Sequence, residues 1–105
     1  MPLRIEPHAD SQAYEAVRWY ERKKSGLGQR FLETYHQSFE SIESSPRSFP
    51  LVKSRSGREF RYCLLKPFAY RVGFEVRPNE VIVLAVAHLR RSSRFWIREL
   101  RGENE

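Results

Sequence analysis

Seven consecutive apolar residues in the second half of the chain constrain its fold more than any other feature. They form the run Val81-Ile82-Val83-Leu84-Ala85-Val86-Ala87. A membrane-spanning helix needs about 20 such residues, so this run is too short to cross a bilayer. A short run that is apolar on both faces is typical of a strand buried inside a sheet. We therefore expect it to be the central strand of the sheet.

Two segments upstream of this run alternate between apolar and other residues, as half-buried strands do. The apolar members of the first segment are Phe60, Tyr62 and Leu64. Those of the second segment are Tyr70, Val72, Phe74 and Val76. Pro78-Asn79 then favours a hairpin turn into the buried run. The three strands are expected to form an antiparallel meander.

The first half of the chain has the period of two amphipathic helices. Asp10 is expected to cap the first helix, whose apolar face comprises Ala13, Ala16, Val17 and Tyr20. Gly26 and Gly28 favour a helix end and a tight turn. The second helix is expected to end before Ser44-Ser45-Pro46. Its apolar stripe comprises Leu27, Phe31, Tyr35, Phe39 and Ile42.

Together these elements predict an α+β fold, a two-layer sandwich in which an αα-hairpin packs on a small antiparallel sheet. Leu3 and Ile5 predict a short N-terminal strand, and Ser45 to Gly57 predict a loop. The element order is β-α-α-β-β-β, followed by a short C-terminal helix from Arg94 to Leu100 that folds Phe95 and Trp96 back on the body. Residues 1–105 are expected to form a single domain.

Positive charge is concentrated in the second half of the chain. Residues 1–52 hold 7 Lys/Arg and 7 Asp/Glu, whereas residues 53–105 hold 12 and 6, which accounts for the whole net charge of +6. Ten of those 12 cations are arginines, which favour bidentate contacts with phosphate or carboxylate. A nucleic acid or an acidic protein is therefore the expected partner, and a solvated basic surface is the alternative.

Other classes of function are excluded by what the sequence lacks. Cys63 is the only cysteine, and His8, His36 and His88 are scattered without the spacing of a metal site. We therefore expect no metal and no cofactor. The chain has no apolar stretch of membrane-spanning length and no apolar core typical of a signal peptide near Met1, so we expect a cytoplasmic protein without a membrane partner.

The positions of the basic residues in the predicted strands suggest a cationic pocket. If the apolar faces of the first two meander strands both pack beneath the helices, Arg61 and Arg71 emerge together on the opposite side of the sheet. His88 ends the buried run, and the residues that would line the pocket beside it are Glu59, Lys53, Arg55, Tyr70, Arg90 and Arg91.

Such a pocket suits RNA cleavage without a metal. That reaction needs a base, an acid and cations for the charge on the phosphorane. Arg61, Arg71 and Arg90 would be the clamp, and Glu59 or His88 would transfer protons. The alternative is that the arginines are ordinary surface residues, that Glu59 forms an exposed ion pair, and that His88 is structural.

Motifs spread over most of the chain carry a resemblance to a known family. In order they are Trp19-Tyr20-Glu21, Gly26-Leu27-Gly28 with Phe31, Ile42 to Pro46, Phe49-Pro50, Arg61, Phe68-Ala69-Tyr70-Arg71-Val72, and Ala85 to Arg91 ending at Trp96. They resemble the ParE-type toxins, also called plasmid stabilization proteins, of the RelE/ParE superfamily of type II toxin-antitoxin systems.

The resemblance implies a small toxin that a cognate acidic antitoxin wraps and silences. ParE-like members resemble inhibitors that bind DNA gyrase, and RelE-like members are similar to endonucleases that cut mRNA on the ribosome. Here Leu89, not tyrosine, follows His88, with Tyr70 as the nearest alternative phenol, and the glycine-linked hairpin favours ParE. An inactive basic interaction module of the same fold is the third reading. A second copy of the chain, giving a homodimer, is a further candidate partner.

Overall fold

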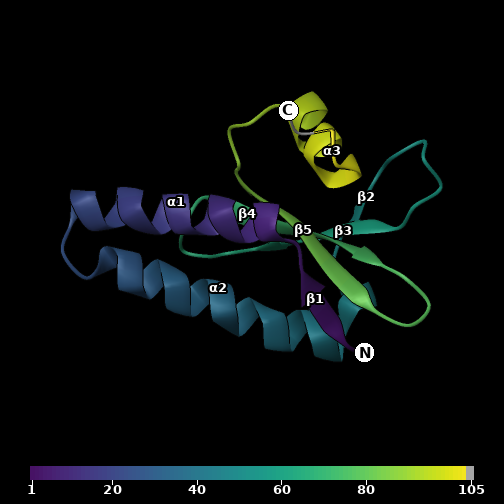
Figure 1. Cartoon of the computed structure of the whole chain (residues 1–105), viewed down its shortest axis with the longest axis horizontal. Coiled ribbons are helices and arrows are strands. Elements are labelled where there is room, and N and C mark those ends of the chain that lie inside the picture. Colours follow the sequence, from purple (N-terminus) through teal and green to yellow (C-terminus); the bar gives the residue numbers. More distant parts are fainter. Residues whose placement is uncertain (104–105) are drawn as a thin grey trace.

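The computed structural model describes residues 1–103 and contains three α-helices around a five-stranded sheet (Figure 1). A short 3-10 turn, η1, follows the second helix. The elements in chain order are β1 (Leu3–Ile5), α1 (Pro7–Lys23), α2 (Leu27–Ser44), η1 (Pro46–Ser48), β2 (Leu51–Val52), β3 (Phe60–Leu64), β4 (Tyr70–Val76), β5 (Val81–His88) and α3 (Ser93–Arg101).

The strand order in the sheet is β1-β5-β4-β3-β2. The predicted antiparallel meander of β3, β4 and β5 is confirmed. The apolar run is an interior strand as expected, but β4 occupies the centre. Two details differ from the prediction. Strand β1 pairs with β5 in parallel, which makes the sheet mixed, and β2 adds an antiparallel edge strand within the expected loop.

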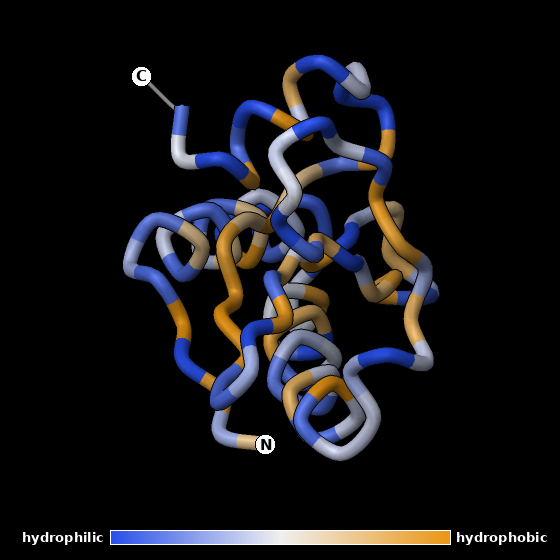
Figure 2. Tube along the Cα trace, turned by 90° about the vertical axis from the view of Figure 1, so that its right-hand side faces the viewer, coloured by the Kyte–Doolittle hydropathy of each residue, from blue (hydrophilic) through white to orange (hydrophobic). Residues whose placement is uncertain are grey.

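The helices cover both faces of the sheet. The hairpin of α1 and α2 packs on one face and buries the larger core, which includes Phe31, Tyr35 and Val72. The predicted C-terminal helix α3 covers the other face with a smaller core around Phe60, Trp96 and Leu100 (Figure 1). In Figure 2 the segment that leads to the C-terminal end is mainly hydrophilic in colour. The α+β prediction is confirmed, and α3 adds a partial third layer.

Strand β3 faces the opposite way from the prediction. Tyr62 lies opposite Gly73, and Phe60 opposite Glu75, so the apolar side of β3 shares a face with these residues of β4. That face lies beneath α3, where Phe60 and Tyr62 pack. Gly73 allows this docking, because a Cβ there would collide with the side chains of Trp96 and Leu100. Arg61 and Cys63 consequently point toward the helical hairpin.

One of two expectations for the hairpin needs correction. Helix α1 begins at Pro7, which suits a first helical position, so Asp10 lies inside the first turn and does not cap the helix. Its carboxylate instead accepts a hydrogen bond of 3.0 Å from the hydroxyl of Tyr35 on α2. The predicted glycine turn is confirmed, with Gly26 at φ 89°, a left-handed conformation that glycine adopts without strain.

Candidate functional site

An open groove of roughly 880 Å³ lies between α1, the end of β5 and the start of α3. It combines basic, aromatic and small apolar side chains. The lining residues are Gln12, Glu15, Ala16, Arg18, Trp19, Arg22, Tyr70, Val86, Ala87, His88, Arg90, Arg91 and Phe95. Four of the residues predicted as candidates, Tyr70, His88, Arg90 and Arg91, therefore lie together.

One wall of the groove is the outer face of α1. Arg18 and Arg22 are one helical turn apart, so their side chains are neighbours on α1, and Trp19 follows Arg18 in the chain. The Trp19 side chain is 45% exposed, although its ring packs edge-on against Tyr20 at 5.0 Å between centroids. The ammonium of Lys23 lies 4.9 Å from the same indole. This wall thus presents a fixed, exposed aromatic ring among cations.

Gln12 ties this wall to the sheet and to α3. Beyond the end of β1, one edge of β5 has no neighbouring strand, and the side-chain oxygen of Gln12 accepts a hydrogen bond of 2.8 Å from the backbone N–H of Val86. The amide nitrogen of Gln12 donates to the carboxylate of Glu99 on α3, which is buried. The Nε2 of His8 also lies 3.0 Å from that carboxylate. These contacts hold the three elements around the groove.

Tyr70 and His88 form the floor at the end of the sheet. They lie opposite each other on β4 and β5, with ring centroids 5.1 Å apart. Burial, and then the charge of Glu15, raises the pKa of the Tyr70 phenol. The Nδ1 of His88 accepts a hydrogen bond of 3.0 Å from the backbone N–H of Arg90, so the neutral ring carries its proton on Nε2. His88 therefore presents a hydrogen-bond donor.

Among the described residues, the arginines of the groove have no carboxylate partners. Within residues 1–103, none of Arg18, Arg22, Arg90 and Arg91 forms a salt bridge, and Glu15 is the one acidic residue in the lining. The guanidinium of Arg91 lies 3.7 Å from the centroid of the Phe95 ring. The groove is therefore a concentration of uncompensated positive charge.

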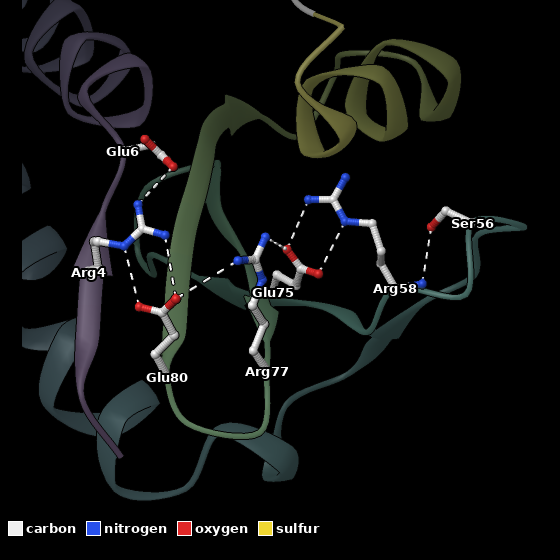
Figure 3. A network of polar contacts seen from close by, with 7 residues as sticks. All are labelled: Arg4, Glu6, Ser56, Arg58, Glu75, Arg77 and Glu80. Carbon is white, nitrogen blue, oxygen red and sulfur yellow. Dashed lines mark hydrogen bonds and ion pairs between the residues drawn. The ribbon is translucent and has the colours of Figure 1, made fainter.

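Arginines at the opposite end of the sheet are neutralised (Figure 3). Arg58 donates two hydrogen bonds of 3.1 and 2.9 Å to the buried carboxylate of Glu75, which also contacts Arg77. Glu80 bridges Arg77 and Arg4. The hydrogen bonds from Arg58 hold the pKa of Glu75 below its usual value, although burial opposes them. The arginines at this end are therefore paired with carboxylates, unlike those that line the groove.

The predicted clamp of Arg61, Arg71 and Arg90 does not assemble. Arg61 points toward the helical hairpin, donating to the backbone carbonyl of Phe49 at 2.6 Å and to Glu59 at 2.8 Å. Glu59 also binds Arg47, and these contacts, Arg47 first, lower the pKa of its carboxyl. Arg61 lies opposite Phe74, and Phe74 opposite Val83, five residues from His88 along β5, a separation of roughly 17 Å.

Arg71 lies on the other face of the sheet, under α3. Its guanidinium is 4.3 Å from the Trp96 ring centroid and 5.7 Å from that of Tyr62. Burial lowers the pKa of Arg71. Its Nε, like the Nε1 of Trp96, is buried without a hydrogen-bond partner in the described part of the chain. Arg71 therefore shares no pocket with His88.

The last two predicted binding residues lie elsewhere, and the groove contains basic and aromatic residues on α1 that were not predicted. Lys53 and Arg55 are exposed between β2 and β3 and do not line the groove. Arg18, Trp19 and Arg22 do line it. Their signal in the sequence is an aromatic residue flanked by arginines on the polar face of a helix. Among residues 1–103, no three His, Cys, Asp or Glu side chains gather as metal ligands.

The geometry defines a small α+β protein with a basic surface groove, and comparison with known proteins gives its family. The family model described as the ParE toxin of the type II toxin-antitoxin system, parDE, matches residues 3–92. The chain belongs to the ParE toxin family, as its motifs indicated. Helix α3 lies outside the matched residues.

A solved structure from the "Chromosomal ParDE TA system from P. aeruginosa" shares the fold. It aligns with a TM-score of 0.62 at 14% sequence identity, over 84% of this chain and 95% of that chain. No curated protein matches the sequence. None of the helices described in residues 1–103 has the length and apolar character needed to span a membrane.

Proposed function

We propose that this protein is a toxin that inhibits DNA gyrase by binding to it, and that a cognate acidic antitoxin holds it silent. Membership of the ParE family supports a toxin in a two-component system. The solved structure with the same fold comes from a system that pairs ParD with ParE. The uncompensated arginines of the groove support an acidic partner, and this attraction should weaken as salt rises.

Binding is favoured over cleavage because the groups that cleavage would need lie far apart in the structure. Arg61 and Glu59 bind each other and Arg47 on one face, Arg71 stacks on Trp96 on the other, and His88 lies at the end of β5. A general base needs a free lone pair within reach of the substrate. The lone pair of His88 on Nδ1 is already bound to the backbone N–H of Arg90.

The ribosome-dependent nuclease is therefore the disfavoured alternative. Its transition state would require cations and proton-transfer groups around one phosphate. The groove supplies cations, but its histidine presents a donor and its one carboxylate, Glu15, lies on the opposite wall on α1. A binding protein needs only the exposed surface that the groove offers.

Induced expression tests this function. Plasmid topology and mRNA integrity are followed in the same cells, with the double variant Arg18→Ala/Arg22→Ala as the comparison. Gyrase inhibition predicts relaxed plasmid and intact transcripts with the wild-type chain, and weaker relaxation with the variant at equal protein level. Cut transcripts with normal supercoiling would support the nuclease, and normal growth with neither change would support the inactive module.

A further inference from the structure

We infer that the groove binds a single strand of DNA. The inference rests on the proposed function for the source of that strand, because gyrase is an enzyme that handles DNA. The binding itself rests on the groove alone. Three features support it, namely unpaired arginines, aromatic rings between them, and a hydrogen-bond donor on His88.

The arginines match a phosphate backbone. Arg18 and Arg22 line one wall, and Arg90 and Arg91 line the other, so a strand between the walls would meet cations on both sides. A guanidinium binds phosphate through two parallel N–H groups, and an arginine without a carboxylate partner gives up no ion pair to do so. The arginines of the opposite end would lose such pairs with Glu75 and Glu80.

The aromatic rings match bases. Trp19 is the exposed ring and packs edge-on against Tyr20, whereas the guanidinium of Arg91 already covers the Phe95 ring. Unstacked bases of a single strand stack on exposed aromatic rings in proteins that bind single strands. Paired bases in a duplex are already stacked, so the rings favour a single strand. An acidic peptide would use the arginines but would leave the planar rings without planar partners.

The third feature is the proton of His88. Because Nδ1 accepts from the backbone of Arg90, the neutral ring carries its proton on Nε2, and His88 is one of the residues that line the groove. A phosphate oxygen accepts such a hydrogen bond without any transfer of the proton. This tautomer cannot act as a general base, but it can donate a hydrogen bond that holds a phosphate in place.

Fluorescence anisotropy with the full purified chain tests the inference. The probe is a labelled DNA strand of about 12 nucleotides, within the usual range of site sizes, and salt is varied from roughly 50 to 200 mM. The same sequence is supplied as RNA and as a DNA duplex, and an acidic peptide of similar length is the competitor. The groove variant is Arg18→Ala/Arg90→Ala.

The matched control is Arg4→Ala/Arg77→Ala, which removes the same charge at the opposite end of the sheet, seven residues and about 24 Å away along β5. Circular dichroism melting establishes that both variants fold. We expect the groove variant to bind the DNA strand at least about tenfold more weakly and with a shallower dependence on salt. The control should stay within about twofold of the wild type.

Several results would overturn the inference. Equal weakening by both variants would show nonspecific attraction to a basic protein. Tighter binding of the RNA or the duplex, or binding of the acidic peptide alone, would assign the groove to another partner. A gyrase supercoiling assay in parallel separates the two proposals: inhibition without DNA binding would remove this inference and leave the proposed function, and DNA binding without inhibition would remove the proposed function.

Discussion

Arg61 and Arg71 lie on the neighbouring strands β3 and β4 but on opposite faces of the sheet. Arg61 lies opposite Phe74, whose ring belongs to the core beneath the helical hairpin, and Arg71 stacks on Trp96 of α3. One phosphate therefore cannot contact both guanidinium groups. This arrangement separates the protein from a nuclease with an arginine clamp, and it makes the role of each arginine testable.

Arg61 is predicted to act through stability. Arg61→Ala removes its hydrogen bonds to the Phe49 carbonyl and to Glu59, and hydrogen bonds of charged groups contribute about 1.5–3 kcal/mol. We expect urea denaturation to give a loss of about that size, with growth arrest unchanged at equal folded protein. Arg61→Lys keeps the charge and should recover part of the stability. Loss of toxicity without loss of stability would indicate a direct functional role.

The ion pair between Arg58 and Glu75 predicts a dependence of stability on pH. The pKa of Glu75 is lowered in the folded state, chiefly by the hydrogen bonds from Arg58. Its contribution is therefore complete above the unfolded value, about 4.3, and is lost as pH falls through the folded value. Glu75→Gln should lower Tm at pH 7 and reduce the further fall in acid. A parallel acid profile for wild type and variant would contradict this assignment.

The apolar stripe of α2 is predicted to contribute unevenly to stability. Phe31 is fully buried and packs against Phe68 and Tyr70, whereas Phe39 is only partly buried. Phe31→Ala should cost about 3–5 kcal/mol, enough to unfold a marginal domain. Phe39→Ala should cost clearly less, although the sequence gives the two residues equal places on the stripe. Equal losses in chemical denaturation would place Phe39 in the core.

Close docking of α3 on β4 predicts that Gly73→Ala is destabilising. The added Cβ would collide with Leu100 and Trp96, and overpacking typically costs about 1–3 kcal/mol. Leu100→Ala alone should also destabilise, because it opens a cavity. The double variant should lose less than the two singles together, since the truncated side chain leaves room for the methyl group. Additive losses would show that α3 shifts as a whole.

Periodicity alone predicted most of the fold. The run from Val81 to Ala87 is apolar on both faces because the helical hairpin covers one side and α3 covers the other. The hairpin followed from the stripe through Phe31 and Tyr35 and from Gly26. The parallel pairing of Leu3 with Val81 could not be predicted, because three residues carry no signal for strand direction.

The predicted orientation of β3 was wrong for a physical reason. Alternation identifies an apolar side but not the layer that covers it, and here the side with Phe60 and Tyr62 is covered by α3. The assumption that both apolar sides meet the same helices placed Arg61 beside Arg71. One side of the groove was predicted, since His88 and Arg90 lie close together in sequence. Trp19 lies far from them along the chain, and only the packing of α1 on β5 brings it there.

The function proposed for this protein is inhibition of gyrase by binding, without cleavage of RNA. Its most direct test is the purified chain in two reactions at equal concentration, supercoiling of relaxed plasmid by gyrase and translation of a defined mRNA on ribosomes, with Trp19→Ala as the variant. We predict that the wild-type chain blocks supercoiling and leaves the mRNA intact, and that Trp19→Ala, which removes an exposed ring, folds normally but inhibits more weakly. Cleavage of ribosome-bound mRNA with unimpaired supercoiling would contradict the claim.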